Sequence, residues 1–205
     1  MSTEKFNPIN DMNPSTHNRG FTLIELLVVI AIIGVLATVV LASLNEARAK
    51  ARDAQRISDV RQLQNVLYLY YDDNNSFPPV ASSGGAGPGG WRVSYLADFM
   101  APLIPYLPQI PVDPINSGPP ASLFAPRPDG SFYYSYYTYP SGTPYGCDFS
   151  GPFAVLTIRA FETSGKANVQ KAKCGPAAMV CPDGGIPNVC RDWSTEFDYS
   201  IIIST

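Results

Sequence analysis

The chain of 205 residues has few of the groups that perform chemistry in enzymes. Its one histidine, His17, lies in a polar N-terminal stretch, so no Ser-His or Cys-His arrangement can form outside that stretch. No phosphate-binding loop, G-x-S-x-G motif or metal-ligand spacing occurs. With a formal net charge of −3, the chain also lacks a broad basic face for nucleic acid. We therefore expect no enzymatic activity, no catalytic residue and no direct binding to nucleic acid.

Cysteine is absent before residue 147, and no C-x-x-C pair occurs, which argues against a zinc cluster. Six aspartates are scattered through the expected loops, at Asp113, Asp129, Asp148, Asp183, Asp192 and Asp198. With backbone carbonyls they could bind Ca²⁺, but their spacing fits no recognisable calcium loop and favours turn formation. We expect no cofactor, with Ca²⁺ as the one alternative left open.

The chain does contain one long hydrophobic run. From Phe21 to Leu44 there are 24 residues, and Glu25 is the only charged one. A helix of that length reaches about 36 Å, enough to cross a bilayer core. A carboxylate inside such a run is costly and indicates a functional site. The plainer alternative is a single-pass anchor whose Glu25 side chain reaches the membrane interface.

The pattern beyond Leu44 is that of an amphipathic helix. No glycine or proline occurs between Gly34 and Pro78, so we expect one continuous helix of about 50 residues. Its expected apolar face recurs at spacings of three and four, at Ala47, Ala51, Ala54, Ile57, Val60, Leu63, Leu67 and Tyr70. Its expected solvated face carries Glu46, Arg48, Lys50, Arg52, Asp53, Arg56, Asp59 and Arg61.

The remainder is rich in proline and glycine and predicts a small antiparallel sheet. Strands are expected at residues 131–139, 153–161 and 167–173, with a possible edge strand at 197–203. Residues 91–100 suggest a short helix or turn that docks Tyr95, Leu96, Phe99 and Leu103 on the long helix. Residues 105–114 carry too many prolines for a helix or a central strand. The fold class is α+β, with a three- or four-stranded meander packed on the amphipathic half of the helix.

The segment Gly-Phe-Thr-Leu-Ile-Glu at residues 20–25, with its aliphatic continuation, resembles the N-terminus of type IV pilins and type II secretion pseudopilins. The resemblance is specific over residues 20–71. It implies that a membrane peptidase cuts after Gly20 on the cytoplasmic side and methylates the new N-terminus at Phe21. It further implies that Glu25 pairs with the N-terminal amine of a neighbouring subunit during assembly. The chain departs from the family pattern in its long, net-neutral leader and in having Ala42 where a proline is common.

The resemblance also implies an organisation: a leader at 1–20, a membrane and filament-core helix at 21–44, its amphipathic continuation at 45–75 and a pilin-like head at 76–205. The expected function is a filament subunit, membrane-anchored with its N-terminus in the cytoplasm and then extended from the cell surface. Expected partners are copies of itself, other pilins, the peptidase, membrane lipid and an assembly platform with a separate ATPase. The alternative is a minor tip or adaptor subunit that binds DNA, a surface or a secreted substrate.

The four cysteines lie beyond the membrane segment, on its expected outer side, where disulfides persist. Three pairings are possible. We favour Cys147 with Cys174, because these residues flank an expected hairpin, and Cys181 with Cys190, because the loop between them closes easily. The two other pairings remain open at this point.

Overall fold

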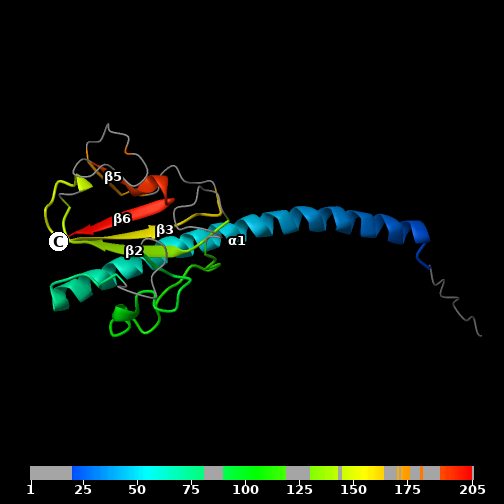
Figure 1. Cartoon of the computed structure of the whole chain (residues 1–205). Coiled ribbons are helices and arrows are strands. Elements are labelled where there is room, and N and C mark those ends of the chain that lie inside the picture. The colour runs from blue at the N-terminus through cyan, green and yellow to red at the C-terminus, as the bar shows by residue number, and fades with distance from the viewer. Residues whose placement is uncertain are drawn as a thin grey trace, which may run out of the picture. The chain divides into compact units, whose positions relative to one another are not determined.

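The computed structural model describes residues 20–80, 90–118, 130–142, 145–163, 170, 172–175, 181 and 190–204. The chain divides into two compact units, Met1–Leu44 and Asn45–Thr205. Its elements follow in the order α1 (Leu23–Asn74), β1 (Arg92–Val93), η2 (Ala101–Leu103), β2 (Tyr134–Tyr139), β3 (Phe153–Ile158), β4 (Lys173–Cys174), β5 (Arg191–Asp192), η5 (Trp193–Thr195) and β6 (Tyr199–Ser204) (Figure 1). The expected α+β class is confirmed.

Helix α1 is continuous over 52 residues, as the lack of helix breakers predicted. Its part in the first unit leaves the large apolar side chains exposed, from Leu23 at 89% to Leu44 at 41%. Within the described residues, α1 is the one helix long and apolar enough to cross a membrane. Its part in the second unit buries Val60, Leu63 and Leu67 completely.

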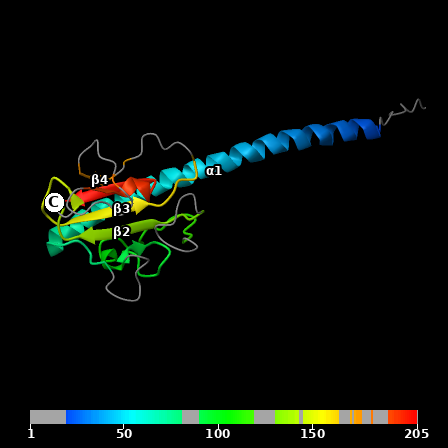
Figure 2. The same cartoon turned by 45° about the horizontal axis from the view of Figure 1, so that its top comes forward.

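The main sheet is antiparallel, with the strand order β1-β2-β3-β6 (Figures 1 and 2). Strand β3 is central: Tyr136 of β2 lies opposite Leu156, which lies opposite Ile201 of β6. The strands expected at 131–139 and 153–161 are present in shortened form, and the C-terminal edge strand is β6. The strand expected at 167–173 is corrected. Of the three residues of that range that the structure describes (170, 172 and 173), Lys173 alone belongs to a strand, β4, which pairs with β5 in a separate sheet; residues 167–169 and 171 lie outside the described residues.

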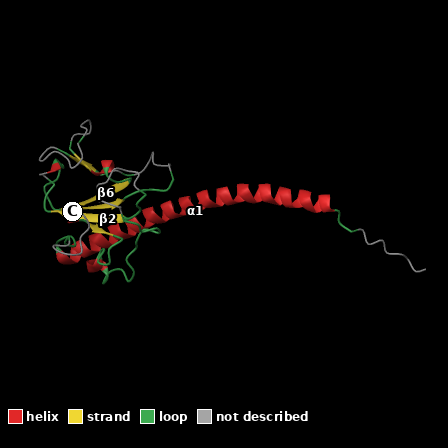
Figure 3. Ribbon diagram, turned by 45° about the vertical axis from the view of Figure 1, so that its right-hand side comes forward, coloured by secondary structure: helices red, strands yellow, loops and turns green. Residues whose placement is uncertain are grey.

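Both faces of the sheet are covered. Alternate residues of each strand point to opposite sides, so the two faces contribute to two separate buried clusters. One face packs on α1 and includes Tyr136, Leu156 and Ile201. The other face packs on the C-terminal segment and includes Tyr139, Phe153 and Trp193, whose indole N–H donates to the Tyr139 hydroxyl at 3.1 Å. All six residues of β3 are buried, which is why its sequence is a nearly unbroken apolar run. Figure 3 shows the strands beside the second part of α1.

The segment at residues 91–100 differs in part from expectation. Arg92 and Val93 form β1 on the edge of the sheet, a strand that was not expected. The chain then continues in turns, one of the two forms that the sequence suggested. Phe99 and Leu103 pack in the core beneath α1 as expected. Tyr95 and Leu96, which follow β1, instead pack against the cluster on the opposite face of the sheet.

Two disulfides link the C-terminal part of the chain. Cys147 is bonded to Cys174, with Cα atoms 4.4 Å apart, and Cys181 is bonded to Cys190, with Cα atoms 5.9 Å apart. This is the pairing favoured from the sequence. The first bond ties the segment before β3 to β4, on the sheet face that lies away from α1.

Candidate functional sites: the helix N-terminus and a buried ionic network

The residues of the expected cleavage site lie outside α1, which begins at Leu23. Gly20 and Phe21 are both exposed, and no described atom lies within 4 Å of a Cβ built on Gly20. The peptide bond between them therefore lies before the first residue of α1.

Glu25 closes a reciprocal cap on the first turn of α1. Its carboxylate accepts from the backbone N–H and from the hydroxyl of Thr22, both at 2.8 Å, and the Glu25 N–H donates to the Thr22 hydroxyl at 3.3 Å. This is the capping-box arrangement, which satisfies backbone donors that a helix start otherwise leaves unpaired. The sequence analysis missed it, although the pattern Thr-x-x-Glu before an apolar run was available as a signal. In a single subunit, Glu25 therefore already has local partners.

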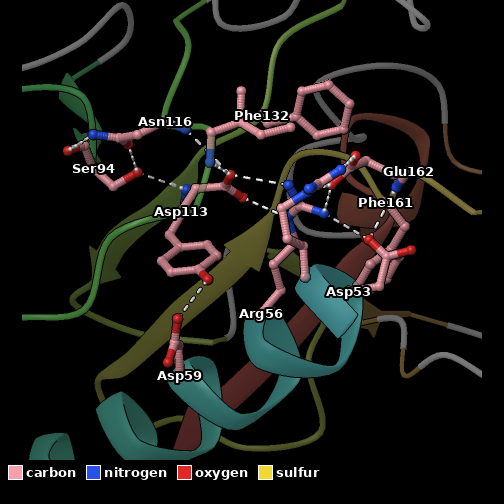
Figure 4. A network of polar contacts seen from close by, with 12 residues as sticks. Asp53, Arg56, Asp59, Ser94, Asp113, Asn116, Phe132, Phe161 and Glu162 are labelled. Atoms are coloured by element: carbon pink, nitrogen blue, oxygen red, sulfur yellow. Dashed lines mark hydrogen bonds and ion pairs between the residues drawn. The ribbon is translucent and has the colours of Figure 1, made fainter. Parts of the chain in front are cut away.

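A second site, on the second unit, centres on Arg56. The Arg56 side chain is completely buried, and its guanidinium donates twice to Asp113, from Nε at 2.7 Å and from Nη2 at 3.1 Å (Figure 4). Its Nη1 donates to Asp53 at 2.6 Å and to Glu162 at 2.9 Å. The expectation that Asp53 and Arg56 lie on a solvated face is therefore wrong: both are buried by partners that lie far along the chain.

Asp53 and Arg52 extend the same network to the loop after β3. Asp53 accepts from the backbone N–H groups of Glu162, at 3.0 Å, and Thr163, at 2.9 Å. Arg52 donates to Glu162 from Nε at 2.7 Å and also from Nη2. The hydrogen bond from Arg52 holds the pKa of Glu162 below its ordinary value, and the contacts with Arg56 act in the same direction. The network thus joins α1 to two loops, the segment that contains Asp113 and the loop that contains Glu162 and Thr163.

Three of the six aspartates considered for Ca²⁺ accept hydrogen bonds from backbone N–H groups. Asp113 also accepts from the backbone N–H groups of Ile115 and Asn116 in a turn. Asp192 accepts from the N–H of Ser194 at the start of η5, and Asp198 accepts from that of Phe161. Asp129 and Asp183 lie outside the described residues. Across the described ranges, no group of three or more His, Cys, Asp or Glu residues is placed to hold a metal ion.

Residues 15–41 match the family model described as the prokaryotic N-terminal methylation motif. A long apolar N-terminal helix packed on an antiparallel sheet, together with this motif, defines a pilin-like protein with a prepilin-type N-terminal segment. Proteins of this class are structural, and the class is not a family of enzymes.

Similar curated proteins narrow the class. The chain is 43% identical over 67 residues to the type II secretion system core protein G of Escherichia coli K12, covering 33% of this chain and 46% of that protein. It is 44% identical over 59 residues to the protein of the same name in Aeromonas hydrophila, covering 29% and 41%. It is 29% identical over 102 residues to the type IV major pilin protein PilA of Myxococcus xanthus, covering 47% and 43%.

The resemblance to the type IV pilin and type II secretion pseudopilin family is thus confirmed. The chain spans less than half of the length of each of these three relatives. No solved structure matches the chain significantly.

Proposed function

We propose that this chain is a structural subunit of a type IV pilus or a type II secretion pseudopilus. The observation that carries the proposal is the exposed apolar surface of α1 between Leu23 and Leu44. A bare apolar helix in water is unfavourable, so it needs a cover of lipid or of other helices. In a subunit that first lies in the membrane and then joins a bundle of identical helices, lipid covers this apolar surface first and neighbouring helices cover it afterwards. The methylation motif and the named relatives support this role.

Processing would prepare the subunit for assembly. A prepilin peptidase would cut after Gly20, remove residues 1–20 on the cytoplasmic side and methylate the amine of Phe21. The exposed, non-helical position of this bond suits such a cut. Residues 21–44 would then remain as the anchor, with residues 45–75 and the head at 76–205 on the outer side.

The new amine supplies a partner that Glu25 does not have before cleavage. In the filament, the Phe21 ammonium of one copy would pair with Glu25 of a neighbour, in place of part of the Thr22 cap. Each charge is costly in an apolar helix bundle, and the two offset each other when they pair. Because the amine exists only after cleavage, processing would control assembly.

The partners of this subunit would be copies of itself, other pilins, the peptidase, membrane lipid and an assembly platform driven by a separate ATPase. A minor tip or adaptor subunit that binds DNA, a surface or a secreted substrate is the alternative from the sequence. Abundance separates the two roles, because a major subunit dominates sheared surface material and a tip subunit does not.

The test is mass spectrometry of filaments sheared from cells that express the full chain, combined with electron microscopy. We expect filaments whose main component begins at an N-methylated Phe21. A mature protein that still begins at Met1, or a chain found only in the membrane, would refute the proposal.

A further inference from the structure

The second unit contains a groove of about 650 Å³ beside α1. One wall consists of Gln55, Asp59 and Gln62 from α1, and the other is the segment Leu107–Pro114. Three residues of this segment are prolines, at Pro108, Pro111 and Pro114, and proline has no N–H to donate. The groove therefore has more hydrogen-bond acceptors than donors in its backbone wall, which favours a ligand that donates.

Asp59 gives the groove a negative charge. Its carboxylate is partly buried and accepts from the Tyr134 hydroxyl at 2.9 Å (Figure 4). Burial raises the pKa of Asp59, an effect that hydrogen bonds from Tyr134 and Gln55 oppose. Within the described part of the chain, Asp59 forms no ion pair with a basic side chain. A carboxylate that is partly desolvated and lacks a counter-ion gains from a cation that enters the groove.

A cation without an acidic partner lies on the other flank of the same helix. Arg61 is exposed, and no ion pair connects it to any residue that the structure describes. It follows Asp59 by two residues, which corresponds to about 200° around the helix and about 3 Å along it. Asp59 accepts a hydrogen bond from Tyr134, which lies on β2. Arg61 acts on Tyr199, which lies on β6: burial raises the pKa of this tyrosine, and the charge of Arg61 lowers it. Strands β2 and β6 lie on opposite sides of β3.

We propose that Arg61 of one copy enters the Asp59 groove of the next copy, so that this pair joins the heads of neighbouring subunits. The inference rests on the proposed filament function. Because the two charges lie on opposite flanks of α1 at nearly the same height, they cannot meet within one chain. They suit a head-to-tail contact, in which one flank of each copy meets the other flank of the next and the contact repeats. A guanidinium has five donors, which matches the carboxylate and the acceptors of the groove.

The test compares the ratio of sheared to membrane-bound subunit for variants of the full chain. Asp59→Asn removes the charge and keeps an acceptor for Tyr134, and Arg61→Gln removes the cation. We expect each to lower the ratio about tenfold, the effect of losing one charge-assisted contact per interface. Arg48→Gln and Asp72→Asn are matched controls, because both residues are exposed charges of α1 outside the groove, and we expect less than about a twofold effect from either.

A direct readout uses Arg61→Lys filaments treated with a carbodiimide, which joins a carboxylate to an amine without a spacer. We expect a peptide in which position 61 of one copy is coupled to Asp59 of another, and no such product from Arg48→Lys filaments. Normal assembly of Asp59→Asn and Arg61→Gln, or coupling of Asp59 to position 48 instead, would overturn the inference while leaving the filament role intact. A wild-type chain that forms no filament would refute the proposed function itself.

Discussion

At the scale of single residues, Glu25 and Arg56 show how differently two charged side chains can be satisfied. Glu25 is exposed in the single subunit and bonds to Thr22, three residues away. Arg56 is buried and bonds to Asp113, 57 residues away. The first arrangement is local and leaves the carboxylate available to a second partner, whereas the second is fixed by the fold of the head.

One substitution can separate the helix cap of Glu25 from its proposed pairing with the Phe21 amine. Glutamine also completes a capping box, so Glu25→Gln keeps the cap and removes only the charge. We expect Glu25→Gln to remain in the membrane but to lose filament assembly, because the neighbour's ammonium is left without a counter-ion. The control is Thr22→Ala, which costs about 1 kcal/mol of helix stability and keeps the charge, so its filaments should persist. Normal filaments from Glu25→Gln would show that Glu25 serves as a helix cap and that assembly does not need its pairing with the amine.

At the scale of elements, the Arg56 network determines where α1 is attached to the head. Asp113 belongs to the irregular segment before β2, and Glu162 to the loop after β3, so one guanidinium holds two loops on one helix turn. The three carboxylates would be left without this cation if Arg56 were replaced by an apolar side chain. A buried charge that loses its partner is among the larger costs that one substitution can cause.

We expect Arg56→Met to destabilise the head by about 3–5 kcal/mol. Arg56→Lys should destabilise it by less, because lysine keeps the positive charge and loses the bidentate hydrogen bonds to Asp113. Denaturant unfolding of the full chain in detergent, followed by the fluorescence of Trp91 and Trp193, measures this. Arg48→Met, an exposed control, should change stability by no more than about 0.5 kcal/mol. If Arg56→Met unfolded at the wild-type denaturant concentration, the network would not be what holds the loops.

The same network predicts the direction of a pH effect. The pKa of Glu162 is lower in the folded head than its ordinary value of 4.5, mainly because of the bond from Arg52. A carboxyl with a lowered folded pKa contributes stability above the ordinary value and loses it as the pH falls through the folded pKa. The contribution of Glu162 is therefore complete at neutral pH and is lost only under more acidic conditions.

At the scale of the whole molecule, the two units depend on different forces. The helix in the first unit is held by local hydrogen bonds and exposes its apolar side chains, whereas the second unit depends on the sheet, the buried network and two disulfides. The Cys147–Cys174 bond closes a loop of 27 residues, and Cys181–Cys190 closes one of 9. In the chain-entropy model the longer loop contributes about 3–4 kcal/mol and the shorter one less.

Reduction should therefore loosen the C-terminal part of the head and leave α1 largely helical. The helical circular dichroism of the full chain in detergent should change little, while the urea midpoint followed by tryptophan fluorescence should fall. Replacing Cys147 and Cys174 by serine should lower the midpoint more than replacing Cys181 and Cys190. Equal effects of the two double variants, or a non-reducing peptide map that joins Cys174 to Cys181 or Cys190, would contradict this.

The sequence by itself determined the features that depend on neighbouring residues. The extent of α1, the membrane-length apolar run, the position of Glu25 and the strands β2 and β3 all follow from spacing, composition and the absence of helix breakers. The favoured cysteine pairing is present, but the expected hairpin that suggested it is not: β3 pairs with β2 and β6, and β4 pairs with β5.

Only the tertiary structure decided which distant groups meet. Arg56 has the same local signature as an exposed helical charge, and its burial depends on Asp113 and Glu162 arriving from segments with no regular pattern. The pairing of β6 with β3, and the place of Lys173 in a separate sheet with β5, are likewise contacts between segments far apart in the chain. Periodicity fixes which face of an element is apolar, but a long-range partner is chosen by the packing of the whole head.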